Sequence, residues 1–160
     1  MSGLSKLTVL FVEDEEDLRG ALESAIGDEF AKFIVARDGD DGLKKFKKYK
    51  PDIVITDIMM PVMDGLVMAK EIKHISKQTP IVILSAFSEK ERLLEAIDVG
   101  IDKYLIKPID PDELLKTLKL VSKEMLDQSD IVDLGFGQKM GQKKENKRTR
   151  KQVVQKRRRG

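Results

Sequence analysis

The sequence contains no cysteine and no tryptophan, and it has a single histidine, His74. The absence of cysteine excludes a disulfide framework, a thiol nucleophile and any zinc site with thiolate ligands. No apolar run approaches the roughly 18 residues that a membrane-spanning helix needs, and residues 1–8 lack the apolar core of a secretory signal. We therefore expect a cytoplasmic protein with no transmembrane segment.

The formal net charge of +2 is small because two opposite charges nearly cancel along the 160 residues. Residues 138–160 hold 11 lysines and arginines and a single acid, Glu145, which gives a net charge of +10. Residues 1–137 hold the other 19 basic residues and 27 acidic ones, a net charge of −8. We predict one folded domain over residues 1–127, followed by a basic, glycine-spaced tail over residues 128–160 that is disordered or weakly structured.

Short apolar runs alternate with stretches of helical periodicity along the first 126 residues. The runs that predict strands are Leu7–Val12, Phe33–Ala36, Ile53–Thr56, Ile81–Leu84 and Lys103–Ile106. The first, third and fourth are almost continuously apolar, which is typical of strands covered on both faces, and the other two are weaker. Five strand–helix repeats predict an α/β fold with a parallel sheet and helices on both faces.

Polar residues follow these strands at the edge where ligands of parallel sheets bind. Glu13 and Asp14 follow the first strand and Asp57 follows the third, while Ser85 and Lys107 follow the fourth and fifth. Because clustered carboxylates oppose one another's ionisation, a divalent cation is needed to balance them, and an all-oxygen site suits Mg²⁺. A cation, a hydroxyl and an ammonium group around one carboxylate favour phosphoryl transfer to that carboxylate, for which Asp57 is the candidate nucleophile.

Four separated segments, in this order, resemble the receiver domain of response regulators of the chemotaxis type. They are Val9–Glu15 (VLFVEDE), Asp52–Gly65 (DIVITDIMMPVMDG), Ile81–Ala86 (IVILSA) and Tyr104–Pro108 (YLIKP). The resemblance covers about residues 5–126. It implies a flavodoxin-like, doubly wound, five-stranded sheet of order 2-1-3-4-5 in three α/β/α layers.

The resemblance also implies a role for each matching residue. Asp57 is the phospho-acceptor, and Lys107 pairs with the phosphoryl group and is held by the proline that follows it. Glu13, Asp14, Asp57 and the backbone carbonyl of Met59 bind Mg²⁺, for which Mn²⁺ or Ca²⁺ can substitute in a crystal. Ser85 and Tyr104 form the switch.

The implied function is that of a two-component response regulator rather than a conventional enzyme. A histidine kinase or phosphotransfer protein donates the phosphoryl group, and the domain promotes its own phosphorylation and dephosphorylation. The face made by the fourth helix, fifth strand and fifth helix then changes its binding to an output protein. The protein is a monomer or a phosphorylation-dependent dimer.

Two alternatives concern the output: a nucleic-acid-binding regulator that acts through the basic tail, or the receiver part of a longer transcription factor. The tail can also dock on an acidic partner.

Other enzyme classes are disfavoured. A dinucleotide or P-loop enzyme needs a glycine-rich loop after the first strand, and a haloacid-dehalogenase-like phosphatase needs a second acid where Met59 stands.

Overall fold

The structure, a computed structural model, describes residues 3–133 of the chain. Its five strands are β1 (Thr8–Val12), β2 (Lys32–Ala36), β3 (Ile53–Asp57), β4 (Ile81–Ser85) and β5 (Lys103–Ile106). The helices are α1 (Glu16–Ile26), α2 (Gly39–Tyr49), α3 (Gly65–Ile75), α4 (Leu93–Val99) and α5 (Pro111–Asp133). Short 3₁₀ segments are η1 (Gly3–Lys6), η2 (Gly27–Glu29) and η3 (Phe87–Arg92).

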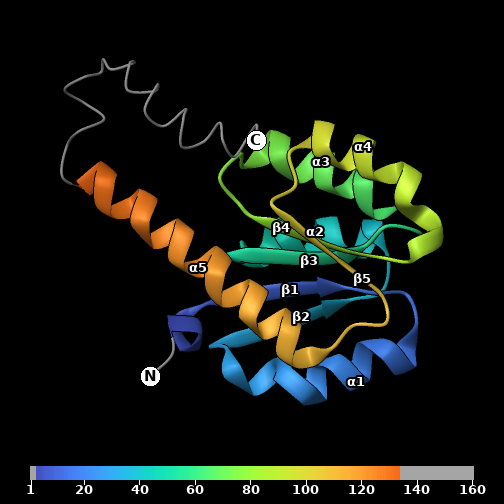
Figure 1. Cartoon of the computed structure of the whole chain (residues 1–160), viewed down its shortest axis with the longest axis horizontal. Helices are drawn as coiled ribbons and strands as arrows, with labels where there is room; N and C mark the ends of the chain where they lie inside the picture. Colours follow the sequence, from blue (N-terminus) through green and yellow to red (C-terminus); the bar gives the residue numbers. More distant parts are fainter. Residues whose placement is uncertain (1–2, 134–160) are drawn as a thin grey trace. The chain divides into compact units, whose positions relative to one another are not determined.

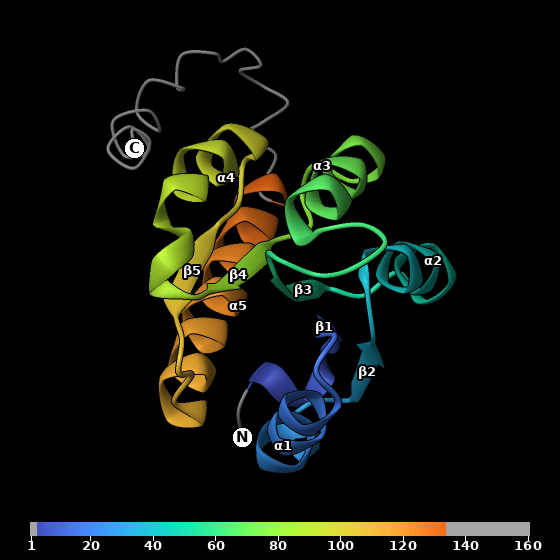
Figure 2. The same cartoon turned by 90° about the vertical axis from the view of Figure 1, so that its right-hand side faces the viewer.

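The five strands form one parallel sheet in the order β2-β1-β3-β4-β5, which confirms the predicted α/β fold and strand order. Helices α2, α3 and α4 lie on one side of the sheet, and α1 and the first turns of α5 lie on the other (Figures 1 and 2). The three strands predicted to be covered on both faces are central. The two weaker runs form the edge strands β2 and β5, where one face or the outer edge meets solvent.

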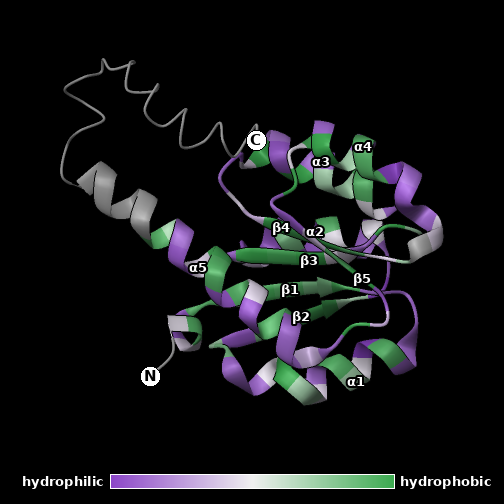
Figure 3. Ribbon diagram, viewed as in Figure 1, coloured by the Kyte–Doolittle hydropathy of each residue, from purple (hydrophilic) through white to green (hydrophobic). Residues whose placement is uncertain are grey.

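The core follows from the alternation of side chains along the strands. One layer packs between the sheet and helices α2, α3 and α4, and its largest buried members are Leu10, Phe46, Ile58, Leu66, Met68, Ile72, Ile81 and Ile83. Figure 3 shows the apolar character of the central strands against the polar outer faces of the helices. A sheet covered in this way leaves its carboxyl edge as the place where polar side chains can gather.

Side-chain caps fix where the helices that flank this edge begin. Asp38 accepts a hydrogen bond from the backbone N–H of Asp41 at the start of α2, at 2.8 Å. Asp110 accepts one from the N–H of Asp112 at 3.0 Å, directly before Pro111, the first residue of α5.

The prediction that Asp57 and Ser85 come after their strands is wrong by one residue. Asp57 is still in register with Leu84, and Ser85 with Ile106, so the strand pairing extends through both. Both side chains therefore project from the last residue of a rigid strand rather than from a loop. On the other side of Ser85, the 3₁₀ segment η3 precedes the short helix α4.

The sheet belongs to a compact unit that ends at Val121. The predicted domain boundary at residue 127 lies within α5, and the part of the predicted basic tail beyond residue 133 lies outside the described residues. Among the described residues, no helix combines the length and the apolar character that crossing a membrane requires.

Candidate functional site: the carboxyl edge of the sheet

Strand register brings the predicted site residues to one edge. Val12 is level with Thr56, so Glu13 and Asp57, the next residue in each chain segment, are level with one another. Ser85 lies one position beyond the partner of Asp57 on β4, and Lys107 lies one position beyond the partner of Ser85 on β5. Four residues up to 94 positions apart in the sequence are thereby gathered at the ends of neighbouring strands.

Three carboxylates form the acidic part of this site. One oxygen from each of Glu13, Asp14 and Asp57 lies within 4.8 Å of the other two, as a metal ion would require. Glu13 and Asp57 are buried, at 1% and 5% exposure, whereas Asp14 is more accessible to solvent. The cluster therefore combines two desolvated carboxylates with one that faces solvent.

Local hydrogen bonds hold Glu13 in place. Its Oε2 accepts from the backbone N–H of Glu15 at 3.0 Å, and Arg19 Nη1 donates to its backbone carbonyl at 2.7 Å. Arg19 projects from the second turn of α1, so the helix fixes the backbone that carries the acidic pair. Arg19 carries no sequence signal of this role, because nothing in the local pattern of a helix indicates which carbonyl an arginine reaches.

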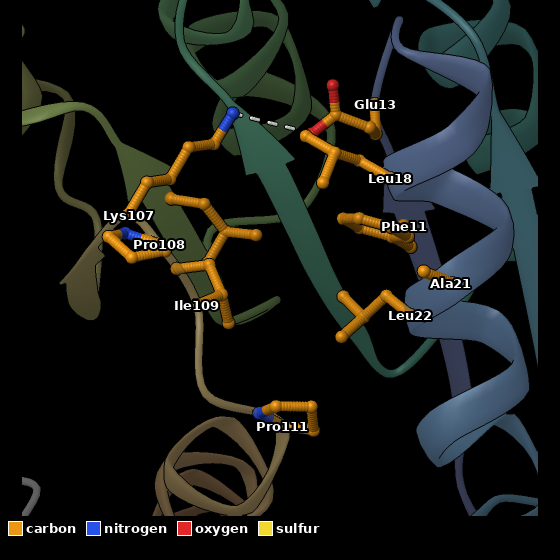
Figure 4. A pocket seen from close by; sticks show the side chains of 10 residues that line it. Phe11, Glu13, Leu18, Ala21, Leu22, Lys107, Pro108, Ile109 and Pro111 are labelled. Atoms are coloured by element: carbon orange, nitrogen blue, oxygen red, sulfur yellow. Dashed lines mark ion pairs between the residues drawn. The ribbon is translucent and has the colours of Figure 1, made fainter.

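Lys107 is the cation of the site. Its Nζ lies 2.6 Å from Asp57 Oδ1 and 3.5 Å from Glu13 Oε1, and the latter pair is marked in Figure 4. The peptide bond between Lys107 and Pro108 is cis. One ammonium group thus contacts both buried carboxylates.

Burial controls the titration of these groups. It is the main cause that raises the pKa of Glu13 to about 7, with a further rise from the charge of Asp57 and partial compensation from the Glu15 N–H and Lys107. Burial also raises the pKa of Asp57, although the hydrogen bond and charge of Lys107 oppose it. For Lys107, burial favours the neutral form, but Asp57 and Glu13 outweigh it and the pKa is raised. The site therefore holds more negative charge than its single ammonium group balances.

Ser85 and Tyr104, the two predicted switch residues, lie in different environments. The Ser85 side chain is buried, and its hydroxyl lies 3.1 Å from the Ala86 carbonyl and 3.2 Å from Glu89 Oε1. Tyr104 is 40% exposed on the edge strand β5, so its ring lies on the surface. Met59 lies in the loop after β3 with an exposed side chain.

Two residues of η3 that no sequence prediction named, Glu89 and Arg92, lie next to the site and its loops. Glu89 accepts hydrogen bonds from Ser85 and from the backbone N–H of Ala86, and Arg92 pairs with Asp64. The sequence does contain a local pattern that indicates the contact of Glu89. A Glu three residues after a helix N-cap, here Ala86, forms one half of a capping box. Arg92 and Asp64 are 28 positions apart, and no local pattern links them.

Beside Lys107 lies a groove of about 470 Å³ between α1 and the segment that joins β5 to α5. Its lining is mainly apolar and includes Phe11, Leu18, Leu22, Pro108 and Ile109, with Glu13 and Lys107 at one end (Figure 4). The apolar groove therefore ends at two members of the charged cluster.

The sheet order and the acidic edge define a flavodoxin-like receiver architecture. Residues 9–119 match the response regulator receiver domain family, and the chain belongs to this family of two-component signalling proteins.

Curated relatives include the transcriptional regulatory protein DltR of Streptococcus agalactiae, 34% identical over 118 residues, which are 74% of this chain and 53% of DltR. The response regulator ArlR of Staphylococcus aureus is 34% identical over 126 residues, 79% of this chain and 57% of ArlR. The chain thus spans little more than half the length of these relatives.

Solved structures show the same fold. The N-terminal domain of an uncharacterized protein from Wolinella succinogenes has a TM-score of 0.71 and 37% identity, covering 76% of this chain and 98% of that domain. The chemotaxis response regulator CheY4 of Vibrio cholerae has a TM-score of 0.66 and 34% identity, covering 72% of this chain and 98% of CheY4.

Proposed function

We propose that the protein accepts a phosphoryl group on Asp57 from a phosphohistidine of a histidine kinase or phosphotransfer protein. The observation that carries this proposal is the position of Asp57, which is buried, 2.6 Å from the Lys107 ammonium group and clustered with two further carboxylates. An Asp57 oxygen forms a bond to phosphorus, the bond from phosphorus to the donor imidazole nitrogen breaks, and the imidazole takes up a proton from solvent. Lys107 offsets the charge that this transfer brings into the site.

The donor set fits a hard divalent cation. Glu13, Asp14 and Asp57 offer only oxygen, and the backbone carbonyl of Met59 is the fourth ligand that we propose. This set suits Mg²⁺, with Mn²⁺ or Ca²⁺ as substitutes, because the buried carboxylates lack sufficient positive charge. When bound, the cation neutralises the phosphoryl oxygens during transfer.

We propose that the output partner binds to the face made by α4, β5 and the first turns of α5. This face exposes large apolar side chains, namely Leu94, Ile97, Tyr104, Ile106 and Leu120. Leu94 is 73% exposed and Ile97 58%, which is unfavourable in water unless a partner covers them. Phosphorylation of Asp57 engages the Ser85 side chain at the end of β4. Because β4 pairs with β5, this contact changes the face that β5 helps to form.

The role proposed is that of a signalling switch in the cytoplasm rather than of a conventional enzyme. The domain contributes the chemistry of its own phosphorylation and dephosphorylation, and the kinase contributes the donor. Binding through the exposed apolar face accounts for either an output partner or a dimer that forms on phosphorylation.

The test is a mass measurement on the intact chain after incubation with a small phosphodonor and Mg²⁺. We expect a gain equal to one phosphoryl group, located by peptide mapping at residue 57, and no gain when a chelator removes the metal. An unchanged mass with every donor tried, or a phosphoryl group at a different residue, would contradict the proposal.

The affinity for Mg²⁺ should depend on pH. Because the pKa of Glu13 is raised to about 7, this carboxyl is mostly protonated at pH 6 and mostly ionised at pH 8, and a metal ion has to displace its proton. We expect Mg²⁺ to bind about tenfold more weakly at pH 6 than at pH 8. Titrations followed by thermal unfolding at the two pH values measure this, and equal affinities would contradict it.

In the metal-free protein, the Glu13 carboxyl has the opposite effect: it stabilises the fold at low pH rather than at high pH. A carboxyl whose pKa is higher in the folded state than in the unfolded state stabilises the fold when protonated. The contribution of Glu13 is therefore present below its ordinary pKa of 4.5 and is lost as the pH rises to about 7. A Glu13→Gln variant should remove this part of the pH dependence.

A second candidate output is nucleic-acid binding, which the names of the relatives favour. DltR is a transcriptional regulatory protein, and residues 138–160 of this chain carry a net charge of +10. The full chain should then retard a DNA fragment at low salt, with an affinity that falls steeply as salt rises. Replacement of residues 156–159 by glutamine should weaken the complex, and an unchanged affinity would exclude this role for these residues.

A further inference from the structure

Two hydrogen-bond donors at the end of β4 converge on a single carboxylate oxygen of the protein itself. The Ser85 hydroxyl lies between two acceptors, Glu89 Oε1 at 3.2 Å and the Ala86 carbonyl at 3.1 Å, and the backbone N–H of Ala86 donates to the same Glu89 oxygen at 3.0 Å. A pair of donors that meets at one point is an arrangement that binds an anionic oxygen. Here that anionic oxygen belongs to Glu89.

The Ser85 donor belongs to the strand end next to Asp57, where the phosphoryl group would arrive. Ser85 lies one residue beyond Leu84, which is level with Asp57 on the neighbouring strand. The Ser85 hydroxyl has one proton and can donate one strong hydrogen bond at a time. It cannot serve Glu89 and a phosphoryl oxygen on Asp57 together.

The segment that carries Glu89 is also tied to the loop after β3. Arg92 Nη2 lies 3.2 Å from Asp64 Oδ2, and Nη1 lies 3.5 Å from Met59 Sδ. Asp64 in turn caps α3 by accepting from the N–H groups of Leu66 and Val67. The 3₁₀ segment η3 is thus held at Glu89 by the end of β4 and at Arg92 by the loop that follows Asp57.

We propose that Glu89 is an internal competitor of the phosphoryl group. Its carboxylate occupies the Ser85 and Ala86 donors in the unphosphorylated protein, and a phosphoryl oxygen on Asp57 takes these donors over. Glu89 is then released, and η3 loses its side-chain tie to the end of β4, just before α4. This inference rests on the proposed phosphorylation of Asp57 and assigns Glu89 a role in setting how readily the phosphorylated arrangement forms.

The experiment measures binding of beryllium fluoride with Mg²⁺, a mimic of a phosphoryl group on a carboxylate, by amide NMR of the full chain. The variants are Glu89→Ala, which removes the competing carboxylate, and Glu89→Gln, which keeps a neutral acceptor for the Ala86 N–H. Glu91→Ala is the matched control, because Glu91 is an exposed acid on the same segment η3. Asp57→Ala reports on the site itself.

We expect both Glu89 variants to bind the mimic about threefold to tenfold more tightly than the wild type, as the loss of a competing hydrogen bond predicts. Glu91→Ala should bind as the wild type does. The Ala86 amide resonance should shift in Glu89→Ala without ligand. In a Ser85→Ala background, Glu89→Ala should increase the affinity for the mimic by less, because one of the two donors for which Glu89 competes is absent.

Glu89 variants that bind the mimic no better than Glu91→Ala would overturn the competition while leaving the proposed function intact. Weaker binding by both Glu89 variants would also overturn it, since Glu89 would then assist the phosphorylated state. Wild-type protein that fails to bind, or an Asp57→Ala variant that still binds, would instead overturn the proposed function and the inference with it.

Discussion

Replacement of Asp57 by alanine is expected to abolish the mass gain that the wild type shows with a small phosphodonor and Mg²⁺. Alanine has no oxygen to attack phosphorus, and the substitution also removes one of the three carboxylates that would hold the cation. No other described carboxylate makes the same close contact with Lys107, since Glu13 Oε1 is 3.5 Å from its Nζ. The loss should therefore be complete rather than partial.

Two further variants make the result specific. Asp98→Ala removes an exposed acid on α4 and should leave the mass gain unchanged. Lys107→Ala leaves the nucleophile in place but removes the ammonium group, and the reaction should slow by about 100-fold. A mass gain that persists in Asp57→Ala would mean that another residue accepts the phosphoryl group.

Replacement of Gly65 by alanine is expected to destabilise the fold by about 3 kcal/mol or more. A Cβ at this position would overlap the backbone carbonyl oxygen of Asp57, and the Gly65 N–H also donates to the Ile58 carbonyl at 2.7 Å. Backbone cannot move aside as a side chain can, so α3 would have to shift away from the end of β3. Denaturant unfolding measures the loss.

Gly20→Ala is the matched control, because Gly20 lies on α1 and a Cβ there would meet no atom within 4 Å. This variant should gain about 0.5–1 kcal/mol of stability, since alanine is the better helix former and nothing blocks its methyl group. If Gly65→Ala and Gly20→Ala unfold at the same denaturant concentration, the close approach of α3 to Asp57 is not a constraint on this fold.

The fold was predictable because its signals are local. The uninterrupted apolar runs of β1, β3 and β4 indicated buried strands, and two weaker runs indicated β2 and β5, whose places at the edges followed only from the family resemblance. The strand ends were misplaced by one residue at Asp57 and Ser85, because pairing with the adjacent strand, rather than residue type, decides where a strand stops.

The candidate site was predictable in its members but not in its contacts. Parallel strands end at one edge, so Glu13, Asp57, Ser85 and Lys107 could be grouped from their places after the strands. The hydrogen-bond partner of Ser85 could not be predicted, because its hydroxyl contacts Glu89 on a 3₁₀ segment that the sequence pattern did not indicate. The links of Arg19 to the Glu13 carbonyl and of Arg92 to Asp64 were likewise missed.

The absence of cysteine and of long apolar runs, the order of strands and helices, and the acids at strand ends are properties of residue type and spacing, and the sequence by itself determined them. The tertiary structure alone decided the distances: Lys107 at 2.6 Å from Asp57, Glu13 buried with its pKa raised to about 7, and Glu89 on the donors of Ser85 and Ala86. The physical reason is that burial and charge contact depend on which strands and loops pack together, and packing joins residues that are distant in the chain.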